Sequence, residues 1–478
     1  MKSPAPAMPD EEIRQSRLIA LVAAGVFFMT GLDGTIIVTA LPQMAHDFGV
    51  RPTALSSSII IYILVSAAML PVSSWIAQRY GTRRVLMVAI GGFTLSSILC
   101  GLVPSLTPFL AARALQAAFA SLMVPVGNLV LLRVTPKRFL VQALAISTTP
   151  ALIAPVVGPP LGGFITGFLN WPWVFFINAP LGIAGLVAAR RIIPELYAEK
   201  RIPFDVASFA LTAGAMCALI FGLDRLSAVD SDRRLAGIIV LCGLTLAVFA
   251  WRHARTAEHT LVPLDALRHE SFFTSTLTAG NFLRVPFNAQ GFVLPLMLQL
   301  GLGLSPVQAG LLLLAQNAGD VVLKPVASKA LHWMGFRLAL TSGSVTMALS
   351  LAACALLDVR IPFAILLLIM FLVGMARSIL FTAMMSISFA DVTDTEMGGA
   401  NVLNNLANAL ASAVGISLSA LLLNLLSGGA AHPDLFAFRL AMLVLAVIAL
   451  LGAPLWARLS DQAGAAVAQR AHHHVDMV

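Results

Sequence analysis

Two opposite charges stand inside long apolar runs of this sequence. Asp33 lies in the run 18–41, and Arg113 lies in the run 107–132. Each run is long enough to cross a bilayer, where a carboxylate near the centre costs about 2.5–3.5 kcal/mol on insertion scales. Charges that are kept at this cost usually have a function. A carboxylate in such a place can bind and release a proton, with an affinity set by a nearby cation.

Counting along the helices places these two charges at a similar depth. Asp33 lies eight residues before the end of its run, or about 12 Å at the α-helical rise. Arg113 lies six residues after the start of its run, or about 9 Å. We therefore predict that they pair, with the aspartate as a titratable group, and a static ion pair is the alternative. Gly31 and Gly34 flank the aspartate and are expected to let another helix approach closely.

Two other runs carry polar stripes at helical spacing. The residues are Asn281, Arg284 and Asn288 in the run 272–298, and Asn401, Asn405 and Asn408 in the run 397–426. A polar face on an apolar helix is expected to line a wet cavity and not to face lipid. We therefore predict that the six residues line a substrate cavity. For the asparagines, hydrogen bonding between helices is an equal alternative.

Three further charges occur inside apolar runs. Asp320 and Lys324 are four residues apart in the favourable order and are expected to neutralise each other. Arg377 has no evident partner in the sequence. The intramembrane charges therefore comprise two acids and four bases, which favours an anionic or zwitterionic cargo over a cationic one.

Motifs for enzyme chemistry, metals and cofactors do not occur in this sequence. It has no HExxH, no Walker-type GxxxxGK and no GxSxG, and its four cysteines form no CxxC pair. The net charge of +8 is not gathered in a hydrophilic basic domain, so it does not indicate nucleic acid binding. We expect no enzyme, no catalytic residue, no metal and no cofactor. The expected partners are a small-molecule substrate, protons and the lipid bilayer, and the protein is expected to be monomeric.

The composition is that of a polytopic membrane protein. Of the 478 residues, 59% are hydrophobic and 11% are charged, whereas soluble domains have about 25% charged residues. Runs long enough to span a bilayer, about 20 residues each, number fourteen. They fall at 18–41, 55–76, 85–104, 107–132, 140–166, 172–192, 204–223, 235–251, 272–298, 306–328, 338–357, 361–389, 397–426 and 435–457.

The basic residues predict the orientation. With a cytoplasmic N-terminus, 20 of the 30 Lys and Arg residues fall on inner segments and five on outer loops. This positive-inside bias predicts that both termini are cytoplasmic. We expect the protein to lie in the bacterial inner membrane.

A repeat predicts the domain organisation. Pro52, Gly81 and Arg83 recur 254 residues later as Pro306, Gly335 and Arg337. Transporters are often built from such repeats, with the substrate site between them. The predicted parts are a cytoplasmic tail (1–17), a six-helix bundle (18–192), a linker with two extra helices (193–270), a second six-helix bundle (271–457) and a cytoplasmic tail (458–478).

The fifth run contains a cluster of helix-bending and small residues. Gly158, Pro159, Gly162 and Gly163 lie in its outer half, where proline bends the helix and glycine permits close contact. We predict that these residues form a gate or seal. A merely bent helix is the alternative.

Four segments together carry a family resemblance. They are "LDGTIIVTALPQMA" (32–45), "LAARALQAAFASLMVPVG" (110–127), "GPPLGG" (158–163) and "WPWVFFINAPLGI" (171–183). The sequence resembles the major facilitator superfamily, in particular its fourteen-span drug:proton antiporter branch. The resemblance implies an all-α membrane fold of two six-helix bundles plus two linking helices, with alternating access and proton-coupled export. It also implies that Asp33 binds the proton, that Arg113 is its coupling partner and that 158–163 is the outward seal.

One family motif is altered. In "SSWIAQRYGTRR" (73–84), Ser74 stands where the family has glycine, and Gln78 stands where it has an acid. Arg79, Gly81, Arg83 and Arg84 are present and, with Gln78, are expected to act in conformational change. Without the acid, the motif lacks the charged latch of the outward-facing state, and we expect a shifted conformational balance.

Three functional hypotheses follow. The first is a proton-coupled antiporter that exports amphipathic small molecules or drugs. The second is a proton-coupled exporter of an anionic or zwitterionic metabolite, which the excess of intramembrane bases favours. The third is a membrane sensor that has lost transport, which rests on the altered motif alone.

Overall fold

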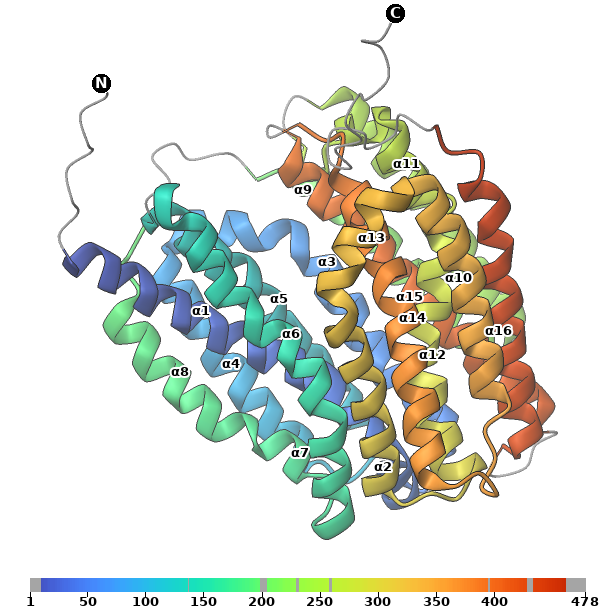
Figure 1. Cartoon of the computed structure of the whole chain (residues 1–478). Coiled ribbons are helices and arrows are strands. Elements are labelled where there is room, and N and C mark those ends of the chain that lie inside the picture. The colour runs from blue at the N-terminus through green and yellow to red at the C-terminus, as the bar shows by residue number, and fades with distance from the viewer. Residues whose placement is uncertain are drawn as a thin grey trace, which may run out of the picture.

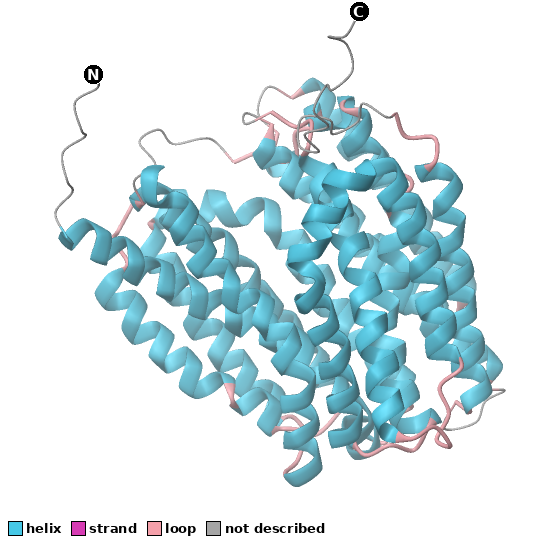
Figure 2. Cartoon of the chain, viewed as in Figure 1, coloured by secondary structure: helices cyan, strands magenta, loops and turns pink. Residues whose placement is uncertain are grey.

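The computed structural model describes residues 10–135, 137–197, 204–228, 232–257, 260–393, 396–427 and 433–460. Within these ranges the chain forms helices joined by turns, and no β-strand (Figure 2). The predicted all-α class is therefore confirmed. Most of both predicted tails lies outside the described residues, although α1 already begins at Asp10.

Six long helices and two short ones make up the first bundle. The long helices are α1 (Asp10–Ile36), α3 (Ser56–Tyr80), α4 (Thr82–Leu102), α5 (Leu106–Val134), α6 (Lys137–Phe168) and α8 (Asn178–Ile192). The short ones are α2 (Leu41–Phe48) and α7 (Trp173–Phe176). Helices suit these apolar sequences because a helix satisfies its own backbone hydrogen bonds where lipid offers none.

Two linking helices follow, α9 (Val206–Ser227) and α10 (Arg233–Thr256). An aspartate caps the start of each one, since Asp205 accepts from the Ser208 amide and Asp232 from the Arg234 amide, both at 2.9 Å. Such caps satisfy backbone donors that the first helical turn leaves unpaired.

The second bundle contains α11 (Glu270–Leu277), α12 (Asn281–Leu296), α13 (Pro306–Ala355), α14 (Phe363–Phe389), α15 (Met397–Leu426) and α16 (Leu435–Trp456). All fourteen predicted runs fall on the helices of the first bundle, the linker and the second bundle. The ninth run is divided between α11 and α12, and the tenth and eleventh both lie in α13. Among the described residues, eleven helices meet the length and hydropathy expected of a membrane span.

The internal repeat is visible in the backbone. Gly81 (φ 93°) separates α3 from α4, and Gly335 (φ 73°), 254 residues later, marks the kink inside α13. Gly49 and Gly303, also 254 residues apart, both have φ of 65°. Positive φ favours glycine because it has no Cβ, so the two halves share turn chemistry as well as sequence.

The start of α1 and the end of α16 lie at the same end of the molecule, which we call the terminal end, and the opposite end is the distal end (Figure 1). The two bundles spread apart toward the terminal end in this view. Hydrogen bonds join them toward the distal end, where Gln299 donates to the Thr39 carbonyl at 3.2 Å. There Asn424 of α15 accepts from Thr53 at 2.8 Å and donates to the Ser227 carbonyl of α9 at 3.1 Å.

Candidate functional site

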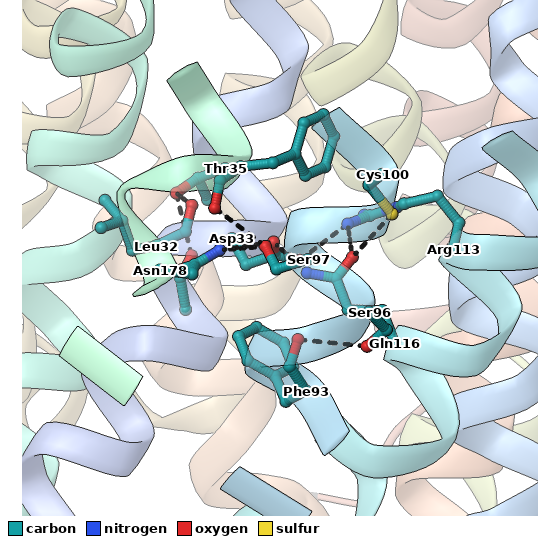
Figure 3. A network of polar contacts seen from close by, with 12 residues as sticks. Leu32, Asp33, Thr35, Phe93, Ser96, Ser97, Cys100, Arg113, Gln116 and Asn178 are labelled. Atoms are coloured by element: carbon teal, nitrogen blue, oxygen red, sulfur yellow. Dashed lines mark hydrogen bonds and ion pairs between the residues drawn. The ribbon is translucent and has the colours of Figure 1, made fainter. Parts of the chain in front are cut away.

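The Asp33 carboxylate lies at the centre of a polar network inside the first bundle (Figure 3). Arg113 of α5 donates to its Oδ2 atom at 2.8 Å. Its Oδ1 atom accepts from Gln116 at 2.8 Å and from Asn178 of α8 at 3.2 Å. Asn178 in turn donates to Ser97 of α4 at 2.9 Å, so four helices hold the carboxylate in place.

This ion pair is closed off from solvent in the described structure. Asp33 and Arg113 each expose 1% of their side chains. The guanidinium lies 4.5 Å from the centre of the Tyr62 ring and 5.6 Å from that of Phe175, in cation–π geometry. Three side chains thus donate hydrogen bonds to one carboxylate that is almost fully enclosed by protein.

Helix α1 is approached closely by α6, through glycines of α6. A Cβ atom added at Gly158 would collide with Thr35, and one at Gly162 with the Ile36 carbonyl. Our expectation for Gly34 was wrong, because a Cβ there would meet nothing within 4 Å. Gly34 instead lines the central cavity described below.

A proline of α6 leaves a backbone carbonyl free to bond the second bundle, which gives another contact between the two halves. Pro159 has no backbone N–H, so it cannot bond the carbonyl of Pro155 four residues earlier. Asn317 of α13 donates to that carbonyl at 2.7 Å. Further along, a Cβ atom at Gly163 would collide with the Pro306 carbonyl of α13, so here backbone contacts backbone across the halves.

A cavity of about 470 Å³ lies between the two bundles. The first bundle contributes Thr35, Ile63 and Pro159, among others, and the second contributes residues of α12, α13, α14 and α15. Thr35 is two residues from Asp33, so the cavity and the buried ion pair lie at the same level of α1 but on different sides of it.

Among the described residues, the charged side chains that line this cavity all come from the second bundle, namely Asp320, Lys324 and Arg377. The Arg377 guanidinium lies 4.2 Å from the centre of the Phe287 ring, which stacks on Phe381 at 5.1 Å. Asp320 Oδ1 is buried and finds no hydrogen-bond partner among the described residues. The cavity therefore combines two bases, one acid and an aromatic wall.

The predicted substrate residues lie in several environments. Asn288 lines the cavity and donates to Asn408 at 3.3 Å. Arg284 is 1% exposed and bonds Asn404, donating to its backbone carbonyl at 3.2 Å and to its side-chain oxygen.

The remaining asparagines bond within their own helices or helix ends. Asn401 and Asn405 are exposed on α15 and hydrogen-bond each other at 3.0 Å. Asn281 donates to the Leu277 carbonyl at 3.0 Å.

The arginines of the altered motif (73–84), between α3 and α4, contact an acidic residue from another segment of the chain. Glu195, in the segment after α8, lies 3.5 Å from Arg83 and 3.9 Å from Arg84. A Cβ at Gly81 would collide with the same carboxylate. Arg79 is exposed, and the side chain of Gln78 lies outside the described part of the chain.

Sequence reasoning missed several residues of these networks, namely Gln116, Asn178, Glu195, Asn317 and Asn404. Gln116 and Asn178 lie in two of the segments that carry the family resemblance. Their polar side chains in otherwise apolar helices were a signal that could have identified them. The acid Glu195 is separated by more than a hundred residues from its arginines and gave no signal.

Comparison with known proteins decides the family. The family model described as Major Facilitator Superfamily matches residues 23–280 and 271–473. The chain belongs to the major facilitator superfamily. A relative from Klebsiella pneumoniae (strain 342), named as multidrug resistance protein MdtD, is 34% identical over 456 residues, covering 93% of this chain and 94% of the relative. The protein of that name from Pectobacterium carotovorum subsp. carotovorum (strain PC1) is 33% identical over 407 residues, covering 85% and 87%.

Solved structures show that this major facilitator has the expected fold. A peptide transporter in complex with alafosfalin aligns with a TM-score of 0.67 at 16% identity, over 95% of this chain and 99% of the other. A bacterial homologue of the human lysosomal transporter Spinster, inward-facing and unoccupied, aligns with a TM-score of 0.66 at 13% identity, over 95% and 98%. The chain is thus an MdtD-like multi-pass transporter of the inner membrane, and not an enzyme.

Proposed function

We propose that this transporter is a proton-coupled antiporter that exports amphipathic small molecules by alternating access. The observation that carries the proposal is the buried Asp33–Arg113 ion pair beside the cavity between the bundles. A titratable group next to a substrate cavity can bind a proton in one state and release it in the other.

The Asp33–Arg113 pair supports proton exchange because the contact between its two charges can be made and broken. In the described state, Arg113, Gln116 and Asn178 all donate to the carboxylate. Withdrawal of Arg113 would leave the carboxylate without its counter-charge, and an unpaired charge in an apolar interior is costly. Binding a proton removes that charge. A helix rearrangement that separates the two charges would therefore take up a proton, and its reversal would release it.

The contacts between the bundles support alternating access. They join α6 to α13 at Gly163 and Asn317, toward the distal end. With the predicted orientation, this is a state closed to the outside. Helix α6 also contacts α1 at Gly158, about one turn from Asp33, so movement of α6 during opening would act on the helix that carries the acid.

The test uses purified protein in proteoliposomes with an imposed pH gradient. Gradient-driven flux of an amphipathic dye is expected in the wild type and absent in Asp33→Asn. Asp47→Asn is the matched control, because this exposed aspartate contacts Trp171 outside the network and its loss should leave flux intact. Asp33→Glu, which keeps a titratable group, should retain part of the flux. Full gradient-driven flux in Asp33→Asn would refute the coupling role.

A second candidate function, export of an anionic or zwitterionic metabolite, is favoured by the cavity itself. Its charged lining is Lys324 and Arg377 against Asp320, which leaves one positive charge in excess. An amphipathic anion would find a guanidinium beside the Phe287 ring. A panel of lipophilic cations, zwitterions and organic anions in the same proteoliposomes separates the two candidates.

A further inference from the structure

A second hollow region lies outside the central cavity, between the linking helix α9 and the first bundle. A cavity of about 650 Å³ is walled by α3, α5 and α9, with apolar residues such as Ile60, Leu64, Leu110 and Phe221. It adjoins a smaller cavity of about 370 Å³, and the two share Ser57, Asp224, Arg225 and Ala228. We call the two together the α9 groove.

The α9 groove is separate from the transport cavity. The two have no lining residue in common. Helix α3 divides them, because Ile59 and Ile63 line the central cavity while Ile60 and Leu64 line the groove. A molecule in the groove would therefore lie on the membrane side of the first bundle.

The groove changes from polar to apolar along its length. Its polar part lies at the distal end, because Ser57 is in the first turn of α3 and hydrogen-bonds Asp224 near the end of α9. From Asp224 the lining extends back to Gly214. Ten helical residues correspond to about 15 Å, which is about half of the hydrocarbon thickness of a bilayer. The apolar part thus has the depth of one leaflet.

The polar part carries charges of both signs. The Asp224 carboxylate accepts from the Ser57 hydroxyl, at 2.9 Å to one oxygen and 3.0 Å to the other. A hydroxyl has a single proton to donate, so this half-buried carboxylate has capacity for another donor. Two guanidinium groups, those of Arg225 and Arg51, line the same part of the groove.

From this arrangement, we propose that the α9 groove binds one glycerophospholipid with a primary-ammonium headgroup, from the leaflet at the distal end. The ammonium donates to Asp224, the phosphate pairs with Arg225 or Arg51, and an acyl chain fills the apolar part. A trimethylammonium headgroup has no N–H to donate to the carboxylate. A glycerol headgroup brings no positive charge. The groove should therefore distinguish phosphatidylethanolamine from phosphatidylcholine and phosphatidylglycerol of the same acyl composition.

Native mass spectrometry of the delipidated full-length protein tests this proposal, with each of the three lipids added in turn. We expect the wild type to retain one phosphatidylethanolamine in preference to the other two. Asp224→Asn should weaken that retention about tenfold or more, as the loss of one charge-assisted hydrogen bond implies. Asp224→Glu should restore the preference.

A groove-filling pair of variants keeps the test independent of Asp224. Ala218→Trp places a large side chain in the apolar part and should abolish retention. Leu241→Trp adds the same side chain on α10, where Leu241 is 64% exposed, and should leave retention unchanged. Equal retention of the three lipids by the wild type would overturn the proposal, as would unchanged retention in Ala218→Trp. Displacement of the lipid by a transported amphipathic cation would assign the groove to substrate instead.

Discussion

The Asp33 carboxylate and the Arg113 guanidinium meet at 2.8 Å, although 80 residues separate them along the chain and each exposes 1% of its side chain. Neither charge has access to water in this state. Each buried charge is therefore stabilised by the other. This mutual stabilisation can be measured from protein stability, separately from transport.

Removing one partner of the pair should cost more than removing both. Asp33→Asn leaves the Arg113 charge buried without its counter-charge, a loss of about 3–5 kcal/mol for pairs of this kind. The double variant Asp33→Asn, Arg113→Met buries no charge and should recover most of the lost thermal stability. Thermal unfolding of the detergent-purified variants measures the difference. Strictly additive losses in the double variant would contradict the pairing.

The Asn317–Pro155 hydrogen bond should help to hold the distal end closed. Asn317→Leu removes the donor to the carbonyl of the half-buried Pro155, at a cost of about 0.5–1.5 kcal/mol for one lost hydrogen bond. Val307, next to Pro306 at the start of α13, packs against Gly167 of α6. Labelling of Val307→Cys by a membrane-impermeant thiol reagent should therefore increase in this variant. In a Pro159→Ala background the helix regains an N–H for that carbonyl, so the same change should increase labelling less. An equal increase in both backgrounds would contradict this account.

Two arginines of the second bundle should differ in their effect on cargo. Arg377 lines the cavity, so Arg377→Ala should lower the flux of organic anions relative to lipophilic cations. Arg284 is buried against Asn404, so Arg284→Ala should change stability and total flux without changing that ratio. Flux ratios in proteoliposomes measure both effects. The opposite result would place the cargo against Arg284.

A carboxylate at the terminal end gives a prediction for pH dependence. His269 contacts Glu396 at 2.9 Å, and this hydrogen bond, with two from Thr393, lowers the pKa of the Glu396 carboxyl from 4.5 to about 2. A lowered folded-state pKa stabilises the fold above the unfolded pKa, and the stabilisation is lost as pH falls through the folded pKa. Glu396→Gln should therefore lower the Tm at neutral pH, and its difference from wild type should shrink between pH 4.5 and about 2. A difference that stays constant over this range would exclude ionisation as its source.

Much of the fold could be predicted from the sequence, because lipid allows few backbone solutions. Long apolar runs had to be helices, and the recurring glycines marked turns that both halves share. The contact between Asp33 and Arg113 also followed from depth alone, since two opposite charges at one level of a small bundle are driven to meet. The close packing of α1 was expected from Gly34, but the glycines of α6 provide it.

The cavity lining could not be predicted in the same way. Helical spacing shows which residues share a face, but it does not show which face the partner helices cover. Arg284 and Asn288 share a face of α12. Nevertheless, Arg284 is covered by Asn404, whereas Asn288 lines the cavity. Arg377, which showed no partner in the sequence, lies in the cavity because α14 turns that side toward the interface.

The Asn424 side chain joins three parts of the chain. It belongs to the second bundle, accepts a hydrogen bond from Thr53 of the first and donates one to the Ser227 carbonyl of the linker. If the distal end opens, the two bundles cannot both keep their contacts with the linking helices. Helix α9 must travel with one bundle and slide against the other. The linking helices therefore move together with one of the two bundles. Whether the hydrogen bond from Asn424 to Ser227 survives opening will show whether they move with the second bundle.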